Sequence, residues 1–543
     1  MALDTGTAFI PCEENPYYRL ATVHGVPDRN MSAESREELR DRNRVTWNRY
    51  FVQGLNSSKK VKLKTEGVPS DDIDTPLTVA EQQAIQQRLN GLEKPNYKET
   101  IDFSKVQFYL GLDMEGFVFA NGADFRGAKF SGRAYFMGAK FSGRADFNGA
   151  KFSGYPNFAR TKFSDYADFN GAKFSGSAHF PGAKFSGIAD FKGAKFSSSA
   201  YFRGAKFSGD AYFIGAKFSD SAYFMGAKFS GNADFKEAKF SFEAIFTGAA
   251  KVEKLREFGG FVRFAGATFE QKADFTNRVF LNTTNFDQCE FITNVPNFAE
   301  AKLHQATTWR GVVWPSLPMI DKTEVKDDPN LDEATKIENP EEVSRNRTNR
   351  VGALVDVTFN LINGEEDQVD ASLNLIYKVE DQVDAYRNLR LRMKQIENYQ
   401  QEVFFLGKEL DAKRRVHWLN KAYFRWFPSL VYKLFSDYGT SLARPVGGLL
   451  CLIASFGALV FWLTAREKAE ALGMMEWVEL GMQSLWFSAR YALPLIGPID
   501  EWNQAISQSL PSGILVFTVG QTILGVLFLF LIGLALRNRF RIR

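Results

Sequence analysis

The sequence predicts a mixed fold: a β-solenoid, then a helical linker, then an α-helical domain with two transmembrane spans. Phe recurs in alternating steps of five and six residues from residue 103 to residue 246. Two long stretches near the C-terminus carry no charge, and helical spacing fills the region that precedes them. The length of 543 residues also favours several domains.

Residues 1–95 precede the repeats and are polar. The stretch SAESREELRDRNRVTWNRYF has helical spacing, and TVAEQQAIQQRL opens with Thr78 and Glu81 at the spacing of a capping box. The first coil of a solenoid exposes apolar side chains and unpaired strand edges. We therefore expect this region to cap the N-terminal end of the solenoid; a small partner-binding module is the alternative.

The Phe repeat predicts short strands separated by turns. Its 27 centre positions hold 26 Phe and Met114, and the position two residues earlier, from Ala123 to Ala244, is Ala at 21 of 23 places. Residues two apart on an extended chain share a face, so Ala and Phe point inward together. Gly, Ser and Asp between the centres are turn residues. Stacked coils would then bury a continuous Phe core.

The segments ADFNG AKFSG, ADFKG AKFSS and AYFIG AKFSD resemble pentapeptide repeats over roughly residues 103–309. The resemblance implies a right-handed quadrilateral β-helix with four pentapeptides to a coil. One extra residue follows each AKF, so a coil uses 22 residues, with one-residue bulges at two opposite corners. We expect the β-helix to cover residues 96–310, with a charged insertion at 247–263, resumption at Phe264 and nine coils in all.

Residues 22 apart then stack into ladders on the four outer faces. Lysines stacked about 4.8 Å apart repel one another unless anions or acids compensate. The first lysine ladder is therefore a candidate binding face for an anionic partner or a cytosolic protein; a solvated surface is the alternative. The expected ladders are Lys129, Lys151, Lys173, Lys195, Lys217 and Lys239; on the opposite side Lys140, Lys162, Lys184, Lys206 and Lys228; Asp124, Asp146, Asp168, Asp190 and Asp234, interrupted by Tyr212; and Tyr135, Asn157, His179, Tyr201 and Tyr223.

Residues 311–350 are typical of a polar linker, and residues 351–438 have helical spacing, with EDQVDA repeated two heptads apart. The helical stretch resembles the linker of bacterial proteins that join pentapeptide repeats to a membrane pore-like domain. The segment VHWLNKAYFRWFPSLVYKLFSDYG mixes aromatic and basic residues, as an interfacial helix at the lipid headgroups does. The linker resemblance rests on Glu402, Phe404, Phe405, Glu409, Arg414 and Arg415.

Residues 439–543 form the predicted membrane domain. Pro445–Ala465 has 21 residues without charge and Trp502–Leu536 has 35, and each can cross a hydrocarbon layer of roughly 30 Å. Basic residues flank the outer ends of both spans, whereas the loop between them is acidic. We expect a multi-pass protein of the bacterial inner (cytoplasmic) membrane, with both termini and the β-helix in the cytoplasm. Three cysteines without disulfide spacing agree with a reducing compartment.

The loop between the spans holds an amphipathic stretch followed by a Pro/Gly turn. This layout resembles that of two-transmembrane pore-loop ion channels, although T-V-G-Y-G is absent. In the second span, Gln521 and Thr522 are candidate pore-lining residues and Gly520 and Gly525 are hinge candidates; helix packing through them is the alternative. The candidate filter and outer mouth are Ala492, Leu493, Pro494, Leu495, Ile496, Gly497, Pro498, Asp500 and Glu501, with Arg490 opposing the acids.

These features favour an oligomeric ion-channel-like pore in the lipid bilayer, coupled to a cytosolic β-helix that senses or recruits a partner. Two spans cannot enclose a pore, so we expect a homo-oligomer, most simply a tetramer. A membrane-anchored scaffold without conductance is the alternative. DNA mimicry needs an acidic surface, yet residues 123–246 carry 13 Lys and 5 Arg against 8 Asp and 2 Glu. We expect no enzyme, metal or cofactor, because no catalytic constellation stands out.

Overall fold

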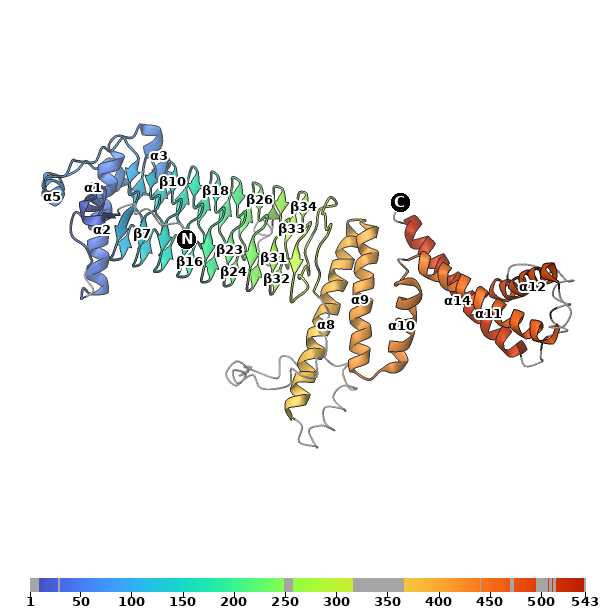
Figure 1. Cartoon of the computed structure of the whole chain (residues 1–543). Coiled ribbons are helices and arrows are strands. Elements are labelled where there is room, and N and C mark those ends of the chain that lie inside the picture. Colours follow the sequence, from blue (N-terminus) through green and yellow to red (C-terminus); the bar gives the residue numbers. More distant parts are fainter. Residues whose placement is uncertain are drawn as a thin grey trace. The chain divides into compact units, whose positions relative to one another are not determined.

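The computed structural model describes residues 9–27, 30–248, 257–315, 366–439, 441–468, 473–494, 506, 510 and 514–541. The chain divides into two compact units, Met1–Ser316 and Leu317–Arg543. The first unit holds the β-strands and a group of N-terminal helices, and the second is helical in its described residues (Figure 1).

The first unit contains a four-sided parallel β-solenoid of about eight turns, with two sheets of 8 strands, one of 9 and one of 10. Each strand is only two or three residues long. Apart from the N-terminal strand Ile10–Pro11, which pairs with the first coil, each strand pairs in parallel with the strand one coil away, which gives the stacked coils of Figure 1. Lys151 pairs with Lys129 on one side and Lys173 on the other, a step of one 22-residue coil. The predicted solenoid is confirmed.

The four sheets carry the four expected ladders, and we name them by their outward residues. The first lysine face consists of β1 (Ile10–Pro11), β3 (Val106–Phe108), β7 (Lys129–Phe130), β11 (Lys151–Phe152), β15 (Lys173–Phe174), β19 (Lys195–Phe196), β23 (Lys217–Phe218), β27 (Lys239–Phe240), β31 (Thr268–Phe269) and β35 (Glu290–Phe291). The second lysine face consists of β5 (Val118–Phe119), β9 (Lys140–Phe141), β13 (Lys162–Phe163), β17 (Lys184–Phe185), β21 (Lys206–Phe207), β25 (Lys228–Phe229), β29 (Glu257–Phe258) and β33 (Val279–Phe280).

The other two faces alternate with the lysine faces around the coil. The aspartate face consists of β2 (Ile101–Asp102), β6 (Ala123–Asp124), β10 (Ala145–Asp146), β14 (Ala167–Asp168), β18 (Ala189–Asp190), β22 (Ala211–Tyr212), β26 (Ala233–Asp234), β30 (Val262–Arg263) and β34 (Thr284–Asn285). The aromatic face consists of β4 (Leu112–Asp113), β8 (Ala134–Tyr135), β12 (Pro156–Asn157), β16 (Ala178–His179), β20 (Ala200–Tyr201), β24 (Ala222–Tyr223), β28 (Ala244–Ile245) and β32 (Ala273–Asp274). The strand order therefore places the two lysine faces on opposite sides, as predicted.

The corners explain the alternating steps of five and six residues. At one kind of corner the Ala128 amide donates to the Phe125 carbonyl at 3.0 Å, and Gly127 between them has a φ of 65°. This is a two-residue turn that needs a left-handed residue. At the next corner three residues, Ser131, Gly132 and Arg133, lie between the inward-facing Phe130 and Ala134, against two at the first corner. The extra residue thus lies in the corner, outside the strands.

Phe rings fill the interior in two arrangements. Rings one coil apart stack in parallel: the centroids of Phe169 and Phe191 are 4.8 Å apart, with 2° between the ring planes. Rings on opposite sides of the solenoid meet edge to face across the core: Phe169 behind the aspartate face and Phe180 behind the aromatic face are 5.5 Å apart at 90°. Both are favourable geometries for aromatic pairs. Since these rings are fully buried, the Phe spacing reports the coil length directly.

The expected insertion at 247–263 is too long. Strand β29 already rejoins the second lysine face, where Phe258 pairs with Phe229 and is fully buried. The pattern therefore resumes at Phe258 and not at Phe264. The prediction of nine regular coils is also modified at the far end of the solenoid. The last coil pairs with the coil before it only through isolated β-bridges, without strands. These bridges are made by Asn297, Lys302, Thr308 and Val313.

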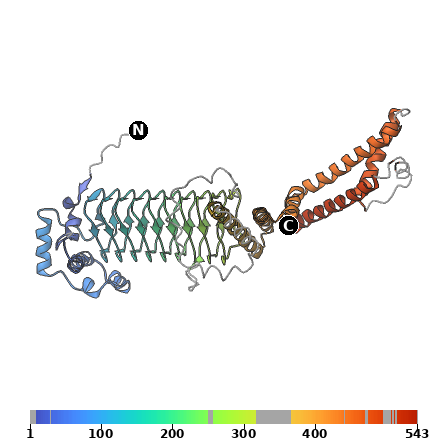
Figure 2. The same ribbon diagram turned by 90° about the horizontal axis from the view of Figure 1, so that it is seen from below.

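The N-terminal helices cover the first coil of the solenoid, where the blue helices of Figure 2 lie at one end of the stacked coils. Trp47 contacts the rings of Phe117 and Phe119, and the Asn48 side chain accepts the Val118 amide at 2.8 Å. The cap therefore satisfies both the apolar layer and part of the bare strand edge. Its elements are η1 (Cys12–Glu14), α1 (Pro16–Ala21), α2 (Ala33–Val52), α3 (Ser57–Thr65), α4 (Ser70–Asp74) and α5 (Val79–Leu89), which begins with the expected capping box at Thr78 and Glu81.

The second unit begins with three helices that contact one another in sequence order: α8 (Glu366–Gln395), α9 (Tyr399–Leu419) and α10 (Tyr423–Ser436). The expected interfacial helix is divided, because α9 ends at Leu419 and Lys421 takes a left-handed φ of 53°. Its aromatic part is α10, where Phe424 is 92% exposed and Phe427 is 60% exposed.

Three further helices follow: α11 (Ala443–Lys468), α12 (Met474–Ala492) and α14 (Ile514–Arg541). Two of them contain segments long and apolar enough to cross a membrane, Ala443–Arg466 and Val516–Asn538. The shorter α12 contacts both α11 and α14. The two candidate spans agree with the sequence prediction.

Candidate functional site

The first lysine face presents its cations unevenly. Lys129 lies over the Phe9 ring, 3.5 Å from the ring centroid, and Lys239 Nζ lies 2.6 Å from Glu270 Oε1. The four lysines between these ends are exposed and form no ion pair with any residue that the structure describes. The face carries in register Lys129, Lys151, Lys173, Lys195, Lys217 and Lys239.

The second lysine face is largely engaged. Lys140 is buried, and both that burial and the nearby Lys162 cation lower its pKa. Lys162 donates to the Glu66 carbonyl of the N-terminal cap, and Lys228 Nζ lies 3.9 Å from Glu257 Oε2. Lys184 and Lys206 are the members of this ladder that are exposed and have no acidic partner among the described residues.

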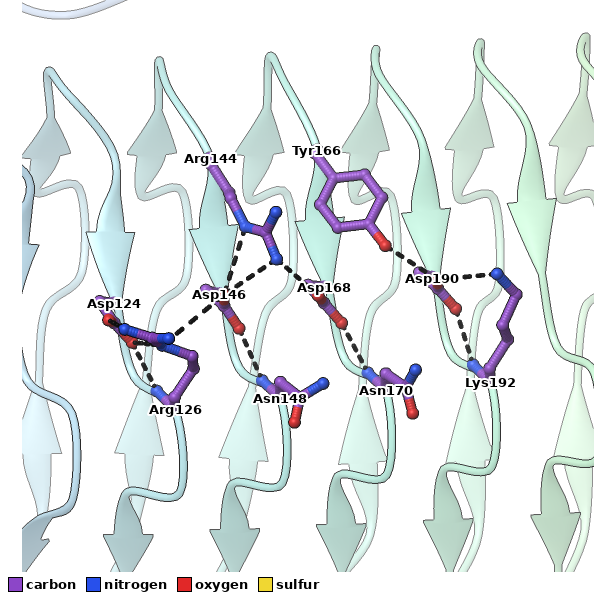
Figure 3. Close-up of polar contacts among 10 residues, drawn as sticks. All are labelled: Asp124, Arg126, Arg144, Asp146, Asn148, Tyr166, Asp168, Asn170, Asp190 and Lys192. Atoms are coloured by element: carbon purple, nitrogen blue, oxygen red, sulfur yellow. Dashed lines mark hydrogen bonds and ion pairs between the residues drawn. The ribbon is translucent and has the colours of Figure 1, made fainter.

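The aspartate face is internally satisfied (Figure 3). Each carboxylate accepts the backbone amide two residues ahead; for Asp168 the donor is Asn170, at 3.0 Å. A second carboxylate oxygen faces a cation or hydroxyl: Arg144 lies 2.8 Å from Asp168, and the Tyr166 hydroxyl donates to Asp190 at 2.8 Å. Burial raises the pKa of Asp168, and the neighbouring aspartates add to the rise. These aspartates therefore act as turn-stabilising groups and not as an open acidic surface.

The aromatic face carries a continuous stack of rings. The ring of His179 lies 4.4 Å from Tyr155 and 4.5 Å from Tyr201, and Tyr201 lies 5.1 Å from Tyr223. Burial lowers the pKa of His179. Because the rings pack on one another, the faces of the inner rings are already occupied.

Several inward positions hold polar groups instead of Ala, and three of them, Thr161, Arg278 and Cys289, bond to a Phe carbonyl of the previous coil. The Thr161 hydroxyl donates to the Phe136 carbonyl at 2.7 Å, and the Cys289 thiol donates to the Phe264 carbonyl at 2.9 Å. Burial raises the pKa of Cys289, as expected of a thiol with a structural role. Arg278 was missed by sequence reasoning; it is fully buried and donates to the carbonyls of Ala227, Phe246 and Phe224.

Arg278 follows the insertion by one coil and lies 4.7 Å from the Phe258 ring centroid. Burial lowers its pKa to about 9, so the guanidinium stays charged at neutral pH. The only sequence signal was a basic residue at a position where Ala is usual.

A polar network links α8, α9 and α10. The Glu409 carboxylate of α9 is buried and accepts from Arg390 of α8 at 2.8 Å and from Lys413 at 2.6 Å. Burial raises the pKa of Glu409, but the hydrogen bonds from Lys413 and Arg390 outweigh that effect and lower it. Asp411, one half-turn further along, accepts from Lys433 of α10 at 2.7 Å.

The network continues to the base of the candidate spans. The Tyr438 hydroxyl donates to Asp411 at 3.1 Å, and Asn538 of α14 donates to the Gly439 carbonyl at 3.2 Å. Asp437, Tyr438 and Gly439 all have left-handed φ values, of 48°, 58° and 80°. Of the residues matched to the linker family, Glu409 and Arg414 lie in this network, and Phe405 is buried beside them on α9.

The α11, α12 and α14 helices are joined by polar contacts in an apolar setting. The Ser488 hydroxyl of α12 donates to the Ile453 carbonyl of α11 at 2.7 Å. Gln521 of α14 donates to the Ser488 carbonyl at 2.8 Å and to its hydroxyl at 2.7 Å. Gln521 is thus buried between helices within this chain.

The other candidates on α14 fall on different sides of the helix. A Cβ added to Gly525 would collide with the backbone of Ala492, so this glycine permits close packing of α14 against α12. Gly520 is exposed, with open space where a Cβ would be, and the Thr522 hydroxyl donates to Thr518 on its own helix.

The candidate filter is only partly covered by the structure. Ala492 is buried against Leu449 and Phe528, Leu493 and Pro494 follow it, and Arg490 lies over the Tyr491 ring. The remaining candidates lie outside the described residues: Leu495, Ile496, Gly497, Pro498, Asp500 and Glu501.

No curated protein and no solved structure matches the chain. One protein-family model does match, that of pentapeptide repeats in nine copies. It covers residues 103–151, 147–195, 180–224 and 213–250. The match falls on the solenoid, where strands repeat every 22 residues and Phe rings fill the core. The first unit is therefore a pentapeptide-repeat β-solenoid, and it is followed in the chain by two helices that can span a membrane.

Proposed function

We propose that the protein is an integral membrane protein whose second unit assembles into an ion-channel-like pore, with the pentapeptide-repeat solenoid as a cytosolic arm that senses or recruits a partner. The observation that carries this proposal is the position of α12 relative to the two candidate spans. The amphipathic helix α12, which is not one of the candidate spans, lies against both of them, held by Ser488 and Gln521. An anchor needs no such helix.

Two spans cannot surround a pore, so the proposed protein is a homo-oligomer, most simply a tetramer. One side of α12 is available for such an assembly or for lipid: Met475 is 82% exposed and Val478, Met482 and Leu485 are also exposed. The membrane is the bacterial inner membrane, with both termini in the cytoplasm, which the basic flanks of the spans favour.

The proposed coupling runs through the network of α8, α9 and α10. Asp411 contacts Lys433 of α10 and Tyr438 just beyond it, and Asn538 of α14 holds the next residue, Gly439. A shift of α9 would therefore act on the bases of both spans through a few polar contacts. We propose no enzymatic role.

Reconstitution of the purified protein into liposomes tests the proposal. We expect ion flux and a particle mass of several chains. Ser488→Ala should reduce flux by loosening α12, whereas Ser455→Ala, which removes a hydroxyl bonded only within α11, should not. A monomer or dimer without flux would instead support the alternative, a membrane-anchored scaffold.

A further inference from the structure

We propose that the first lysine face binds anionic lipid headgroups at a membrane surface. This inference rests on one part of the proposed function, that the spans cross a bilayer, and does not require conduction. The two lysine ladders have the same sequence repeat, but the structure distinguishes them. On the second lysine face the N-terminal cap occupies one end of the ladder and Glu257 lies beside Lys228. On the first, four consecutive lysines have no acidic partner among the residues that the structure describes.

These four lysines form a straight, regular row of cations. Each belongs to a two-residue strand paired in register with the next coil, so the charged groups repeat about every 4.8 Å along one flat side. The members are Lys151, Lys173, Lys195 and Lys217, all exposed. Repulsion within such a row is relieved when anions lie along it.

The borders of the row leave this charge uncompensated. Serines follow each strand, and Ser153, Ser175, Ser197 and Ser219 are exposed beside the lysines. Asp220 stands at the corner of the last coil, where it accepts its neighbour's amide at 2.6 Å. On the adjoining aspartate face the carboxylates are already held by cations, hydroxyls and backbone amides.

A lipid surface fits this face better than a nucleic acid does. Proteins that bind single strands offer aromatic faces on which bases stack, but the rings on the adjoining aromatic face stack on one another. Forked guanidinium groups, which suit phosphate recognition, are absent from the four-lysine row itself. Point charges in a flat row suit a planar array of diffusing headgroups, which needs no fixed phosphate spacing. The chain's own spans would hold that surface at high effective concentration.

The full chain in lipid nanodiscs tests the inference by energy transfer to a headgroup acceptor. In a Cys451→Ser background, which removes the exposed cysteine, a donor dye is placed at Ser175→Cys on the first lysine face or at Ser186→Cys beside the second. We expect transfer from the first position to rise when phosphatidylglycerol is mixed into phosphatidylcholine and to fall with added salt. Transfer from the second position should change less.

The alternating ladders provide a matched pair of variants. Lys173→Gln with Lys195→Gln neutralises two free lysines of the first face, and Lys184→Gln with Lys206→Gln neutralises the two free lysines of the opposite face. Each lysine near an anionic surface contributes roughly fivefold, so the first pair should weaken the lipid-bound state about 25-fold. The second pair should leave it unchanged.

Three results would overturn the inference: transfer that ignores lipid charge, equal effects of the two variant pairs, or loss of transfer caused by a single-stranded oligonucleotide at stoichiometric amounts. Elution of the protein with the nanodiscs checks insertion of the spans separately. A flat signal from inserted protein therefore overturns the lysine-face proposal and leaves the pore proposal standing.

Discussion

The side-chain amide of Gln521 donates to the backbone carbonyl of Ser488 at 2.8 Å, which joins the second candidate span to the helix between the spans. Such bonds between membrane helices contribute about 0.6 kcal/mol on average and rarely much above 1.5 kcal/mol. Because Gln521 bonds twice to Ser488, we expect Gln521→Leu to lower the free energy of unfolding by about 1 kcal/mol. Thermal unfolding in detergent, followed by size-exclusion chromatography, measures this. Thr522→Val is the control, and an equal loss in both variants would contradict the assignment.

Gly525→Ala should disrupt the packing of α14 on α12, because the added Cβ would meet the Ala492 backbone. The matched change Gly520→Ala, five residues earlier on the same helix, meets open space and should be neutral or stabilising by up to about 1 kcal/mol. Thermal stability in detergent compares the two. If Gly520 were instead a hinge, Gly520→Ala would reduce ion flux without lowering stability.

Glu409→Gln should destabilise the α8–α9–α10 group, because three cations would lose their shared carboxylate. We expect the free energy of unfolding to fall by about 1–3 kcal/mol. The loss is limited because those cations are partly exposed to solvent. Glu402→Gln, on the same helix and without an ion pair among the described residues, is the control. Helix content followed by circular dichroism against denaturant reports the difference.

The lowered pKa of Glu409 predicts the direction in which the stability of the protein changes with pH. Because the folded pKa of Glu409 lies below its ordinary value of 4.5, its stabilisation is complete above that value. It is lost as the pH falls through the lower, folded pKa. The native protein should therefore lose stability on acidification, and Glu409→Gln should flatten that loss. If the variant lost stability on acidification as steeply as the native protein does, the assignment of this pH dependence to Glu409 would be wrong.

Phe240→Ala should destabilise the solenoid by about 3–5 kcal/mol, the usual cost of removing a buried aromatic ring. Phe242→Ala, two residues away, should change stability by less than about 0.5 kcal/mol, because that ring is 46% exposed at a corner. Chemical denaturation of the full chain compares the two. Similar losses in both would mean that the assignment of Phe240 to the core and of Phe242 to an exposed corner is wrong.

The solenoid was predictable because one physical rule repeats at every coil. A strand of two residues can bury only one large side chain, so Phe marks each side of the coil and its spacing gives the register. The insertion was misjudged because extra residues break the regular Phe spacing, so Phe258 could not be recognised as a resumed centre.

The details that escaped prediction depend on contacts between coils. Tyr166 meets Asp190, 24 residues ahead, because a corner residue leans over the next coil. Arg278 reaches the carbonyl of Ala227, 51 residues earlier, through the core. In the second unit, Gln521 was recognisable as a polar residue in an apolar helix, but only its distance to Ser488 shows that it packs against a helix of its own chain.

The 22-residue register has a consequence for how such an arm can change in length. Inserting one whole coil would add one lysine to each basic face, one aspartate to the third and one ring or polar group to the fourth. The charge per unit length would stay the same while the total charge and the reach grew. Surface chemistry and length are thus separate variables in this architecture. The residues within one coil set the surface chemistry, and the number of coils sets the length.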